Sequence, residues 1–223
     1  MSSNIQLFNE DCMPAMAKMK DKQFDLAIVD PPYFSGPDKL GYFGAEYSQT
    51  KVKRQNYKIL GDWTVPKQNY FDEILRVSKE QIIWGFNYFR IMNLGSGRII
   101  WDKKNDHSTF SKCEIAYNSK HEHVSLFRFM WNGMLQENMG RNKEIRIHPT
   151  QKPCELYRWL LKNYAKPNDK ILDTHLGSGS IAIACYDMGF DLVGYEIDES
   201  YFEAASKRLD NHKKQLTLLY EQT

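Results

Sequence analysis

The sequence predicts an α/β fold, with a mixed and mostly parallel sheet that carries helices on both faces. Short apolar runs such as Phe24–Val29 end at turn residues, as the buried strands of parallel sheets do. In the last third of the chain, strand-like segments alternate with helix-like ones, and a glycine-rich turn at 177–179 joins the first pair. The length of 223 residues suits one domain.

The first two thirds of the chain contain more predicted strands than helices. Ile5–Phe8 has the alternation of a strand, and residues 67–78 place apolar side chains near one face of a helix. Phe127, Phe129 and Trp131 alternate along a strand and are predicted to lie in the sheet core. The other predicted strands are Phe24–Val29, Gln81–Phe86, Arg98–Trp101, Glu114–Tyr117 and Val124–Trp131.

The last third of the chain is the most regular part. Pro153 suits the first position of a helix that continues to Tyr164, and Asp198 suits the N-cap of a final helix. Between them the order is strand, turn, helix, strand, which together with the final helix is the unit of a Rossmann-like sheet. The predicted bounds are Lys170–Asp173, Ser180–Met188 and Leu192–Glu196, and the final helix is expected to bury Phe202, Ala205 and Leu209.

Composition and cysteine spacing exclude several classes of protein. The chain is 42% hydrophobic and 26% charged, which is typical of a globular domain and not of a disordered or collagen-like chain. No apolar run approaches the ~20 residues of a membrane-spanning helix, and the first residues lack the pattern of a secretory signal. The four cysteines are far apart, so reduced thiols and a cytoplasmic location are expected.

Basic residues concentrate in two stretches of the chain. Residues 34–60 and 119–152 each carry a net charge of +3, whereas the whole chain carries +2. One face that meets a polyanion would produce this distribution, and solvated loops would produce it as well. We predict that 34–60 and 119–147 are nucleic-acid-facing insertions of a single domain, 1–223, with contacts from Lys51, Lys53, Arg54, Arg141 and Lys143.

The segment from Asp173 to Ser180 is predicted to bind a nucleoside cofactor. Its glycines permit a tight turn and the close approach of a ligand, and the following helix offers free N–H groups. Glu196, at the end of the next strand, is placed to accept hydrogen bonds from ribose hydroxyls. The dinucleotide fingerprint is absent, because Ala182 stands where a third glycine would fall. A simple strand–helix turn is the structural alternative.

A second motif, Asp30-Pro31-Pro32-Tyr33, stands directly after a predicted strand. The prolines fix the backbone, so the Asp30 carboxylate and the Pro31 carbonyl can both point outward as rigid acceptors. Such acceptors suit an exocyclic amino group, which has two hydrogens to donate. Tyr33 offers a ring on which a base can stack. The simpler alternative is a turn that ends the strand.

These motifs together resemble the beta class of amino-DNA methyltransferases, which use S-adenosylmethionine and carry the catalytic motif before the cofactor motif. His148–Pro153 is similar to that family's HPTxKP motif. The glycine loop departs from the family pattern, because Thr174, His175 and Ser180 replace proline, phenylalanine and threonine. The resemblance implies catalytic roles for Asp30, Pro31, Pro32 and Tyr33, and cofactor contacts by Asp11, Cys12, Asp30, Thr150, Lys152, Asp173, His175, Gly177, Ser178, Gly179, Glu196 and Ile197.

The same resemblance implies site-specific methylation of N6 of adenine in double-stranded DNA, by base flipping and direct in-line transfer. Aspartate at position 30 favours adenine, since relatives that act on N4 of cytosine more often carry serine there. A cytosine-N4 enzyme and an inactive DNA-binding relative are the alternatives. The motif order argues against RNA and glutamine methyltransferases, and a nicotinamide enzyme would need the third glycine.

Two short segments have more than one interpretation. His121-Glu122-His123 resembles a metal-binding pair, but no further ligand pattern accompanies it, so a polar strand end is preferred and no metal is expected. Residues 215–220 resemble a motif with which DNA enzymes dock on the replication sliding clamp, and a terminal strand explains them as well. A homodimer is compatible with the sequence.

Overall fold

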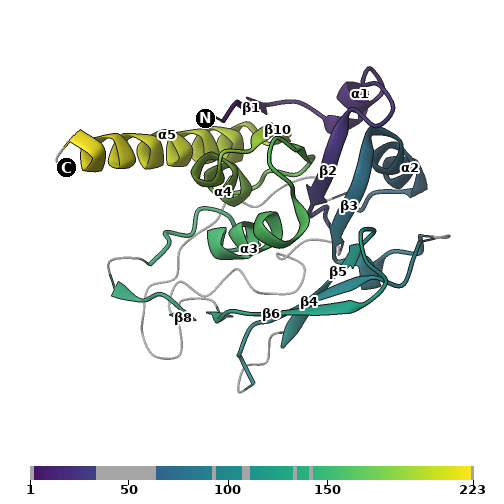
Figure 1. The fold of residues 1–223 in the computed structure, drawn as a ribbon, viewed down its shortest axis with the longest axis horizontal. Coiled ribbons are helices and arrows are strands. Elements are labelled where there is room, and N and C mark those ends of the chain that lie inside the picture. The colour runs from purple at the N-terminus through teal and green to yellow at the C-terminus, as the bar shows by residue number, and fades with distance from the viewer. Residues whose placement is uncertain are drawn as a thin grey trace.

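The computed structural model describes residues 3–33, 64–91, 94–106, 111–132, 135–140 and 143–221. Its centre is an eight-stranded sheet with the order β1-β10-β9-β2-β3-β5-β4-β6 (Figure 1). The short strands β7 (Trp131–Asn132) and β8 (Leu135–Gln136) pair separately. The strands of the main sheet are β1 (Ile5–Phe8), β2 (Phe24–Val29), β3 (Ser78–Trp84), β4 (Arg98–Asp102), β5 (Cys113–Asn118), β6 (Val124–Arg128), β9 (Lys170–Asp173) and β10 (Asp191–Tyr195).

Most neighbouring strands of the main sheet run parallel. β1, β10, β9, β2 and β3 form one parallel block, and β4 pairs in parallel with β6. β5 runs antiparallel to both of its neighbours, β3 and β4. The predicted mixed, mostly parallel sheet is therefore confirmed. The carboxyl ends of the five strands in the block meet at one edge of the sheet.

Helices cover both faces of this sheet. α1 (Cys12–Met16) and α2 (Gln68–Val77) lie on one side of β2 and β3, and α3 (Cys154–Tyr164), α4 (Ser180–Met188) and α5 (Glu199–Glu221) lie on the other (Figure 1). β2 shows why helices are needed on both faces, because its apolar side chains point to both sides of the sheet. Leu26 and Ile28 belong to the core beneath α3 and α4, whereas Ala27 and Val29 belong to the core beneath α1 and α2. A strand buried on both sides reads as a continuous apolar run.

Most of the predicted elements are confirmed. β1, β2, β9 and α4 have the predicted bounds, and the other predicted strands and helices differ by a few residues. Asp198 caps α5 as predicted, because its Oδ1 accepts a hydrogen bond from Tyr201 N at 3.1 Å. Phe127, Phe129 and Trp131 are buried in the core. The segment 34–60, predicted to be an insertion, lies outside the described residues.

Three predicted boundaries are wrong for local reasons. β3 begins at Ser78, directly after α2, and ends at Trp84, because Gly85 turns the chain in a left-handed conformation before the 3₁₀ helix η1 (Phe86–Tyr88). The strand predicted over 124–131 ends at Arg128, and Trp131 starts β7 instead. Pro153 precedes α3 with an extended ψ of 146° and so caps the helix without being part of it.

The final helix differs from the prediction in two respects. Tyr201 is buried where Phe202 was expected, and Phe202 is only half-buried. α5 continues to Glu221, so a terminal strand over 215–220 is wrong. The side chains of 216–221 lie outside the described part, and clamp docking stays a prediction. Within the described chain, no helix has the length and apolar character required to cross a bilayer.

Candidate active site

Three acidic side chains stand at the carboxyl ends of adjacent parallel strands. Asp173 ends β9, Glu196 follows β10, and Asp30 follows β2. The connections change face between β9 and β2, since α4 follows β9 on one face and α2 follows β2 on the other. Ligands of open α/β sheets bind at such a switch point.

The glycine loop after β9 wraps around the carboxylate of Glu196. Glu196 Oε2 accepts a hydrogen bond from Gly177 N at 2.8 Å, and Oε1 accepts one from Asp198 N at 3.0 Å. Gly179 has a φ of 70°, and a Cβ there would lie 3.1 Å from Ala205 of α5. The loop conformation therefore requires glycine at 179, both for the backbone and for the helix that packs against it. Burial raises the pKa of Glu196 although the N–H groups oppose it.

Asp173 and His175 are joined by a hydrogen bond of 3.0 Å from His175 N to Asp173 Oδ1. Burial raises the pKa of Asp173 to about 8. Burial lowers the pKa of His175 to about 4. At neutral pH the imidazole is therefore uncharged, and burial favours the protonated form of Asp173.

Tyr70 of α2 contacts two of the three residues that depart from the family pattern, Thr174 and His175. Its Oη lies 2.6 Å from Thr174 Oγ1, which in turn lies 3.0 Å from His175 Nδ1. The Tyr70 ring meets the imidazole edge-on, with 5.4 Å between the ring centroids. Thr174 and His175 are thus anchored by a side chain that stands 104 residues before Thr174. The sequence carries no local signal for this contact.

Asp30 is paired with Lys152, a buried lysine that also contacts Glu114. Lys152 Nζ lies 2.6 Å from Asp30 Oδ2 and 2.8 Å from Glu114 Oε2, and its side chain is only 2% exposed. Glu114 forms a second ion pair with Lys103. Burial raises the pKa of Asp30 against the effect of Lys152. Burial also opposes ionisation of Glu114, but the two ammonium groups outweigh it and lower the pKa of Glu114 to about 2.

The second oxygen of Asp30 is available for a donor. Asp30 Oδ1 is buried and has no hydrogen-bond partner within the part of the chain that the structure describes. An unpaired buried acceptor is costly unless a ligand supplies a donor. This oxygen therefore indicates a place for an N–H or O–H group at the end of β2.

Tyr33 completes the motif with an aromatic face. Its ring stacks on Tyr88, with 4.8 Å between centroids and planes 10° apart, and meets Phe89 edge-on. Its hydroxyl group hydrogen bonds to Glu114. Gly85 lies directly against the ring, because a Cβ at that position would be 2.2 Å from Tyr33 Cδ1.

The segment 148–153 brings the two halves of the site together. His148 Nδ1 accepts a hydrogen bond from Thr150 N at 3.3 Å, and its ring packs against Gly177 of the glycine loop. Burial lowers the pKa of His148 to about 3, so this imidazole is neutral. Two residues further along the chain, Lys152 reaches Asp30. One short segment therefore contacts both the glycine loop and the end of β2.

Arg208 of α5 is a further link that sequence reasoning missed. Its Nη1 donates to Ser178 O at 2.9 Å, and its Nη2 donates to Glu144 Oε2 at 2.7 Å. Glu144 Oε1 in turn accepts from Cys154 N. Arg208 thus ties the glycine loop to the segment before 148. Glu114, Lys103, Tyr70 and Arg208 belong to no short motif, so only their contacts reveal them.

Pro31 is buried and Pro32 is half-buried directly after β2, and the remaining predicted site residues lie on other segments. Asp11 caps α1 by accepting from Met13 N at 2.9 Å, and buried Cys12 has a pKa raised to about 12, mainly by burial. Ile197, beside Glu196, is exposed. Lys143 is exposed at the start of the segment that leads to Glu144. Lys51, Lys53, Arg54 and Arg141 lie outside the described residues.

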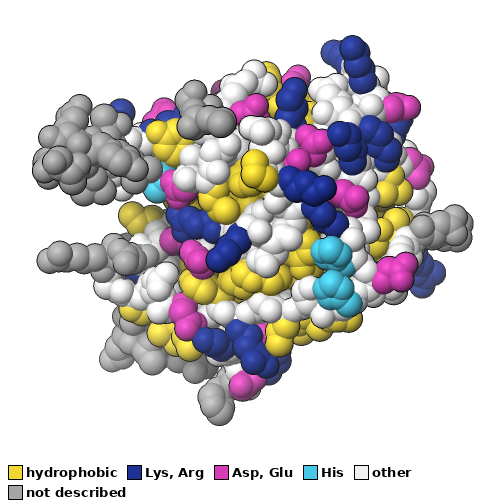
Figure 2. Space-filling model, in the orientation of Figure 1, with side chains coloured by type: hydrophobic (Ala, Val, Ile, Leu, Met, Phe, Trp, Pro, Cys, Tyr) yellow, Lys and Arg dark blue, Asp and Glu magenta, His cyan; other side chains and the backbone are white. Residues whose placement is uncertain are grey.

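Figure 2 shows how charge is distributed over one face of the molecule. On this face the coloured lysine and arginine side chains are dispersed among acidic ones and do not form one patch. His121 and His123 stack on each other, with 4.9 Å between ring centroids. No group of three or more metal-ligating side chains occurs among the described residues.

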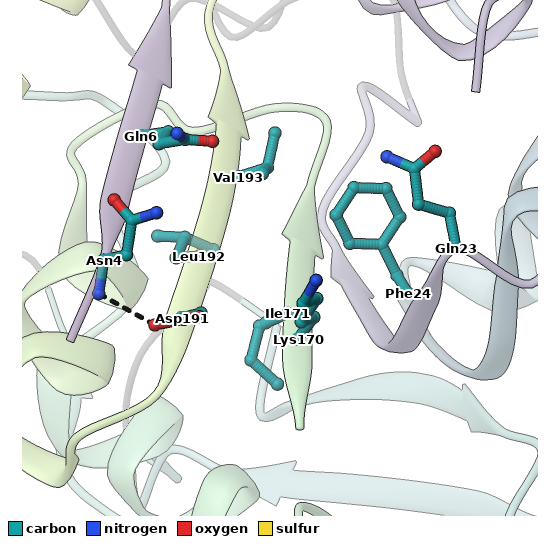
Figure 3. Close-up of a pocket in the computed structure, with 9 residues that line it drawn as sticks. All are labelled: Asn4, Gln6, Gln23, Phe24, Lys170, Ile171, Asp191, Leu192 and Val193. Atoms are coloured by element: carbon teal, nitrogen blue, oxygen red, sulfur yellow. Dashed lines mark hydrogen bonds between the residues drawn. The ribbon is translucent and has the colours of Figure 1, made fainter. Parts of the chain in front are cut away.

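A cavity of about 170 Å³ lies at the opposite edge of the sheet (Figure 3). Its walls come from the first residues of β2, β9 and β10 and from the segment that enters β1, where Asn4 N donates to Asp191 Oδ1 at 2.8 Å. None of the predicted site residues lines it. The candidate site is therefore the edge formed by the strand carboxyl ends.

Comparison with known families shows to which family the chain belongs. The model of the N6/N4 DNA methylase family matches residues 68–207, which is more than half of the chain. The chain belongs to the DNA methylase family. The methylase is 21% identical over 248 residues to the type II methyltransferase M2.MboI of Moraxella bovis, with 92% of this chain and 87% of that protein aligned. The protein is thus a DNA methyltransferase, and DNA is its substrate.

Solved structures share the fold of this methylase. The M1.HpyAVI–SAM complex aligns with 92% of this chain and 100% of its own, at a TM-score of 0.55 and 19% identity. The PvuII DNA methyltransferase, described as cytosine-N4-specific, aligns with 92% of this chain and 86% of its own, at a TM-score of 0.58 and 12% identity. These likenesses confirm the α/β fold of an S-adenosylmethionine-dependent methyltransferase.

The residues at the strand ends of the methylase fit S-adenosylmethionine, the methyl donor of the family. Gly177 and Gly179 let the loop turn with positive φ angles of 53° and 70°, and the Glu196 oxygens retain lone pairs beyond those that accept backbone N–H groups. His175 is uncharged and only partly buried, so it does not repel a cationic ligand. The ion pair of Asp30 and Lys152 lies at the end of β2, the strand next to β9, and therefore beside the glycine loop.

Changing Gly85 to alanine is expected to disable the methylase by displacing Tyr33. The new Cβ would overlap the Tyr33 ring, and the φ of 69° would add strain. Gly189→Ala is a matched control, because Gly189 has a φ of 76° and open space around it. We expect Gly85→Ala to cost about 1–3 kcal/mol more in urea unfolding than the control, and to lower methyl transfer far more. Equal losses in both variants would contradict the role of the Tyr33 contact.

Proposed function

We propose that the protein methylates N6 of adenine in DNA by direct transfer from S-adenosylmethionine to a flipped base. The observation that carries the proposal is Asp30 Oδ1, a buried acceptor without a donor at the end of β2. A stacked base cannot reach this position, so the target nucleotide has to leave the duplex. The exocyclic amino group then supplies the donor that Asp30 lacks.

Asp30 and Pro31 orient the amino group for reaction. Two hydrogens of the amino group are donated to Asp30 Oδ1 and to the Pro31 carbonyl, which turns the nitrogen lone pair toward the methyl group. The cofactor supplies an electrophilic methyl group on a sulfonium. As the N–CH₃ bond forms, the S–CH₃ bond breaks and its electrons stay on sulfur. The amino nitrogen then releases one proton, which Asp30 Oδ1 would accept.

Tyr33, fixed by the rigid Pro32 before it, provides the surface on which the base stacks. A flat ring fits there, because Tyr88 stacks on Tyr33 with 4.8 Å between centroids. Tyr88 is 55% exposed, so a base can displace it at small cost in buried area. The Tyr33 hydroxyl is held by Glu114 and keeps the ring in place. Aromatic stacking of this kind tolerates any base, so Tyr33 holds the target without selecting it.

The cofactor contacts follow from the strand ends. Glu196 would bind the ribose hydroxyls, and Asp11, Cys12 and Ile197 would surround the adenine ring. The loop from Asp173 to Gly179 would bind the methionine portion, with His175 in the place of the family's phenylalanine. Thr150 and Lys152 would close the site beside Asp30. These roles are proposals based on the resemblance and on the positions described above.

DNA would approach the same edge of the sheet. Lys143 is exposed and leads into Glu144, which Arg208 connects to the glycine loop. The net positive charge of 34–60 and 119–152 supports contact of these segments with phosphates. We infer that 34–60 and 119–147 recognise the target, in the cytoplasm, as expected of a type II modification enzyme.

Analysis of the reaction product tests the choice of base. Purified protein is incubated with S-adenosylmethionine and unmodified DNA, and the DNA is digested to nucleosides for mass spectrometry. N6-methyladenine is the expected product, because position 30 is aspartate. N4-methylcytosine would contradict the adenine assignment while the site chemistry stands. If neither product forms although the protein still binds S-adenosylmethionine, the proposed reaction is refuted.

A further inference from the structure

The carboxylate of Glu114 is the meeting point of three side chains from distant parts of the chain. Glu114 stands near the start of β5, and Lys152 Nζ lies 2.8 Å from its Oε2. Lys103, directly after β4, pairs with Oε1. The Tyr33 hydroxyl hydrogen bonds to the same carboxylate. Glu114 is therefore connected to both ends of the Asp30–Tyr33 motif. It reaches Asp30 through Lys152, and it contacts Tyr33 directly.

The charges in this cluster alternate and cancel. In the order Asp30, Lys152, Glu114, Lys103, two carboxylates and two ammonium groups balance, and the side chain of Glu114 is only 17% exposed. Lys152 donates a hydrogen bond to Asp30 Oδ2 and forms an ion pair with Glu114 Oε2. If Glu114 were neutral, Lys152 would be held by Asp30 alone and could move onto both of its oxygens. Asp30 Oδ1 would then no longer be a free acceptor.

From this geometry we infer that Glu114 is a positioning residue for methyl transfer, which holds Lys152 and Tyr33 so that Asp30 Oδ1 stays open to the amino group of the target base. The inference rests on the proposed function, since it assigns Glu114 a part in the same reaction. Glu114 acts through its neighbours and needs no contact with the base. Lys103 acts one step further away, by fixing the second oxygen of Glu114.

The variants Glu114→Gln and Lys103→Met test this arrangement. Glutamine keeps the shape of Glu114 and removes its charge, and Glu80→Gln is the matched control, because Glu80 accepts a hydrogen bond from Ser119 away from the site. We expect Glu114→Gln to lower the single-turnover rate by about 10- to 100-fold, as a small misplacement of a catalytic group does. Binding of S-adenosylmethionine, measured by calorimetry, should change little.

The pH profile separates positioning from a merely structural role. Asp30 is surrounded by Lys152, Lys103 and Glu114, and Asp173, Tyr70 and Tyr157 also lie within electrostatic range. The charge of Glu114 raises the pKa of Asp30, and that of Lys103 lowers it. The acid limb of the rate profile should therefore move to lower pH in Glu114→Gln and to higher pH in Lys103→Met. A defect of folding would lower the rate at every pH without these opposite shifts.

A carboxyl titration gives a readout that does not depend on DNA. With ¹³Cγ-labelled aspartate, the pKa of Asp30 should fall in Glu114→Gln and rise in Lys103→Met. If the wild-type protein methylates DNA and Glu114→Gln retains its rate and its acid limb, the inference about Glu114 is wrong and the proposed function stands. If the wild type transfers no methyl group, the proposed function fails, and the titration alone decides whether Glu114 controls Asp30. Should Glu114→Gln not fold, the Lys103→Met shift decides, and an unchanged profile there would overturn the inference.

Discussion

Replacing Asp30 with alanine is expected to lower the rate of methyl transfer to DNA by about 10²–10³-fold, the cost of removing one preorganised partner of a reacting group. The change removes the free acceptor at the end of β2 and leaves the amino group of the base oriented only by the Pro31 carbonyl. Single-turnover transfer of a labelled methyl group measures the chemical step directly.

The matched control for this variant is Asp25→Ala. Asp25 lies at the other end of the same strand, where it pairs with the exposed Lys79. Its removal should leave the transfer rate close to that of the wild type. Binding of S-adenosylmethionine should weaken less in Asp30→Ala than the rate falls. Full transfer activity in folded Asp30→Ala would refute the catalytic role of this carboxylate.

Replacing Lys152 with methionine is expected to destabilise the fold by about 3–5 kcal/mol at neutral pH, because it leaves buried carboxylates without their common partner. Lys152 is the only group that joins Asp30 and Glu114 among the described ion pairs, and its side chain is 2% exposed. Methionine has a similar volume to lysine, so the loss of stability reflects the missing charge and not a cavity. Urea unfolding measures this loss of stability.

The size of this loss should depend on pH. Without Lys152, burial and Glu114 raise the pKa of Asp30 further above its unfolded value. An acid with a raised folded pKa is destabilising only once the unfolded chain ionises, so the penalty grows as the pH rises and is smallest in acid. Lys79→Met, which breaks an exposed pair with Asp25, should change stability little at any pH. A loss in Lys152→Met that does not change between pH 5 and pH 8 would contradict the buried-pair explanation.

The sequence was sufficient where local pattern determines structure. The run from Phe24 to Val29 is apolar at every position but Asp25, which predicts a strand covered on both faces, and the structure has it with the same bounds. Asp198 could be predicted as a cap because capping involves residues only a few positions apart. The predicted boundaries were wrong where a single backbone turn ends an element, as at Gly85, which ends β3.

The candidate site divides in the same way. Short sequence patterns predict the motif at 30–33, the glycine loop and Glu196. The fold brings them to one edge of the sheet, because parallel strands share a direction. Glu114, Lys103 and Tyr70 are different. Each is an ordinary residue in its own segment and acquires a role only through a partner far away in the chain.

The sequence by itself therefore determined the fold class, the motifs and the residue that we propose as the acceptor for the amino group. The tertiary structure alone decided how Asp30 is held: 122 residues separate it from Lys152, and Glu114 reaches that lysine from a third segment. The physical reason is that a buried ion pair depends on distance and desolvation in space, which the spacing of residues along a chain does not encode.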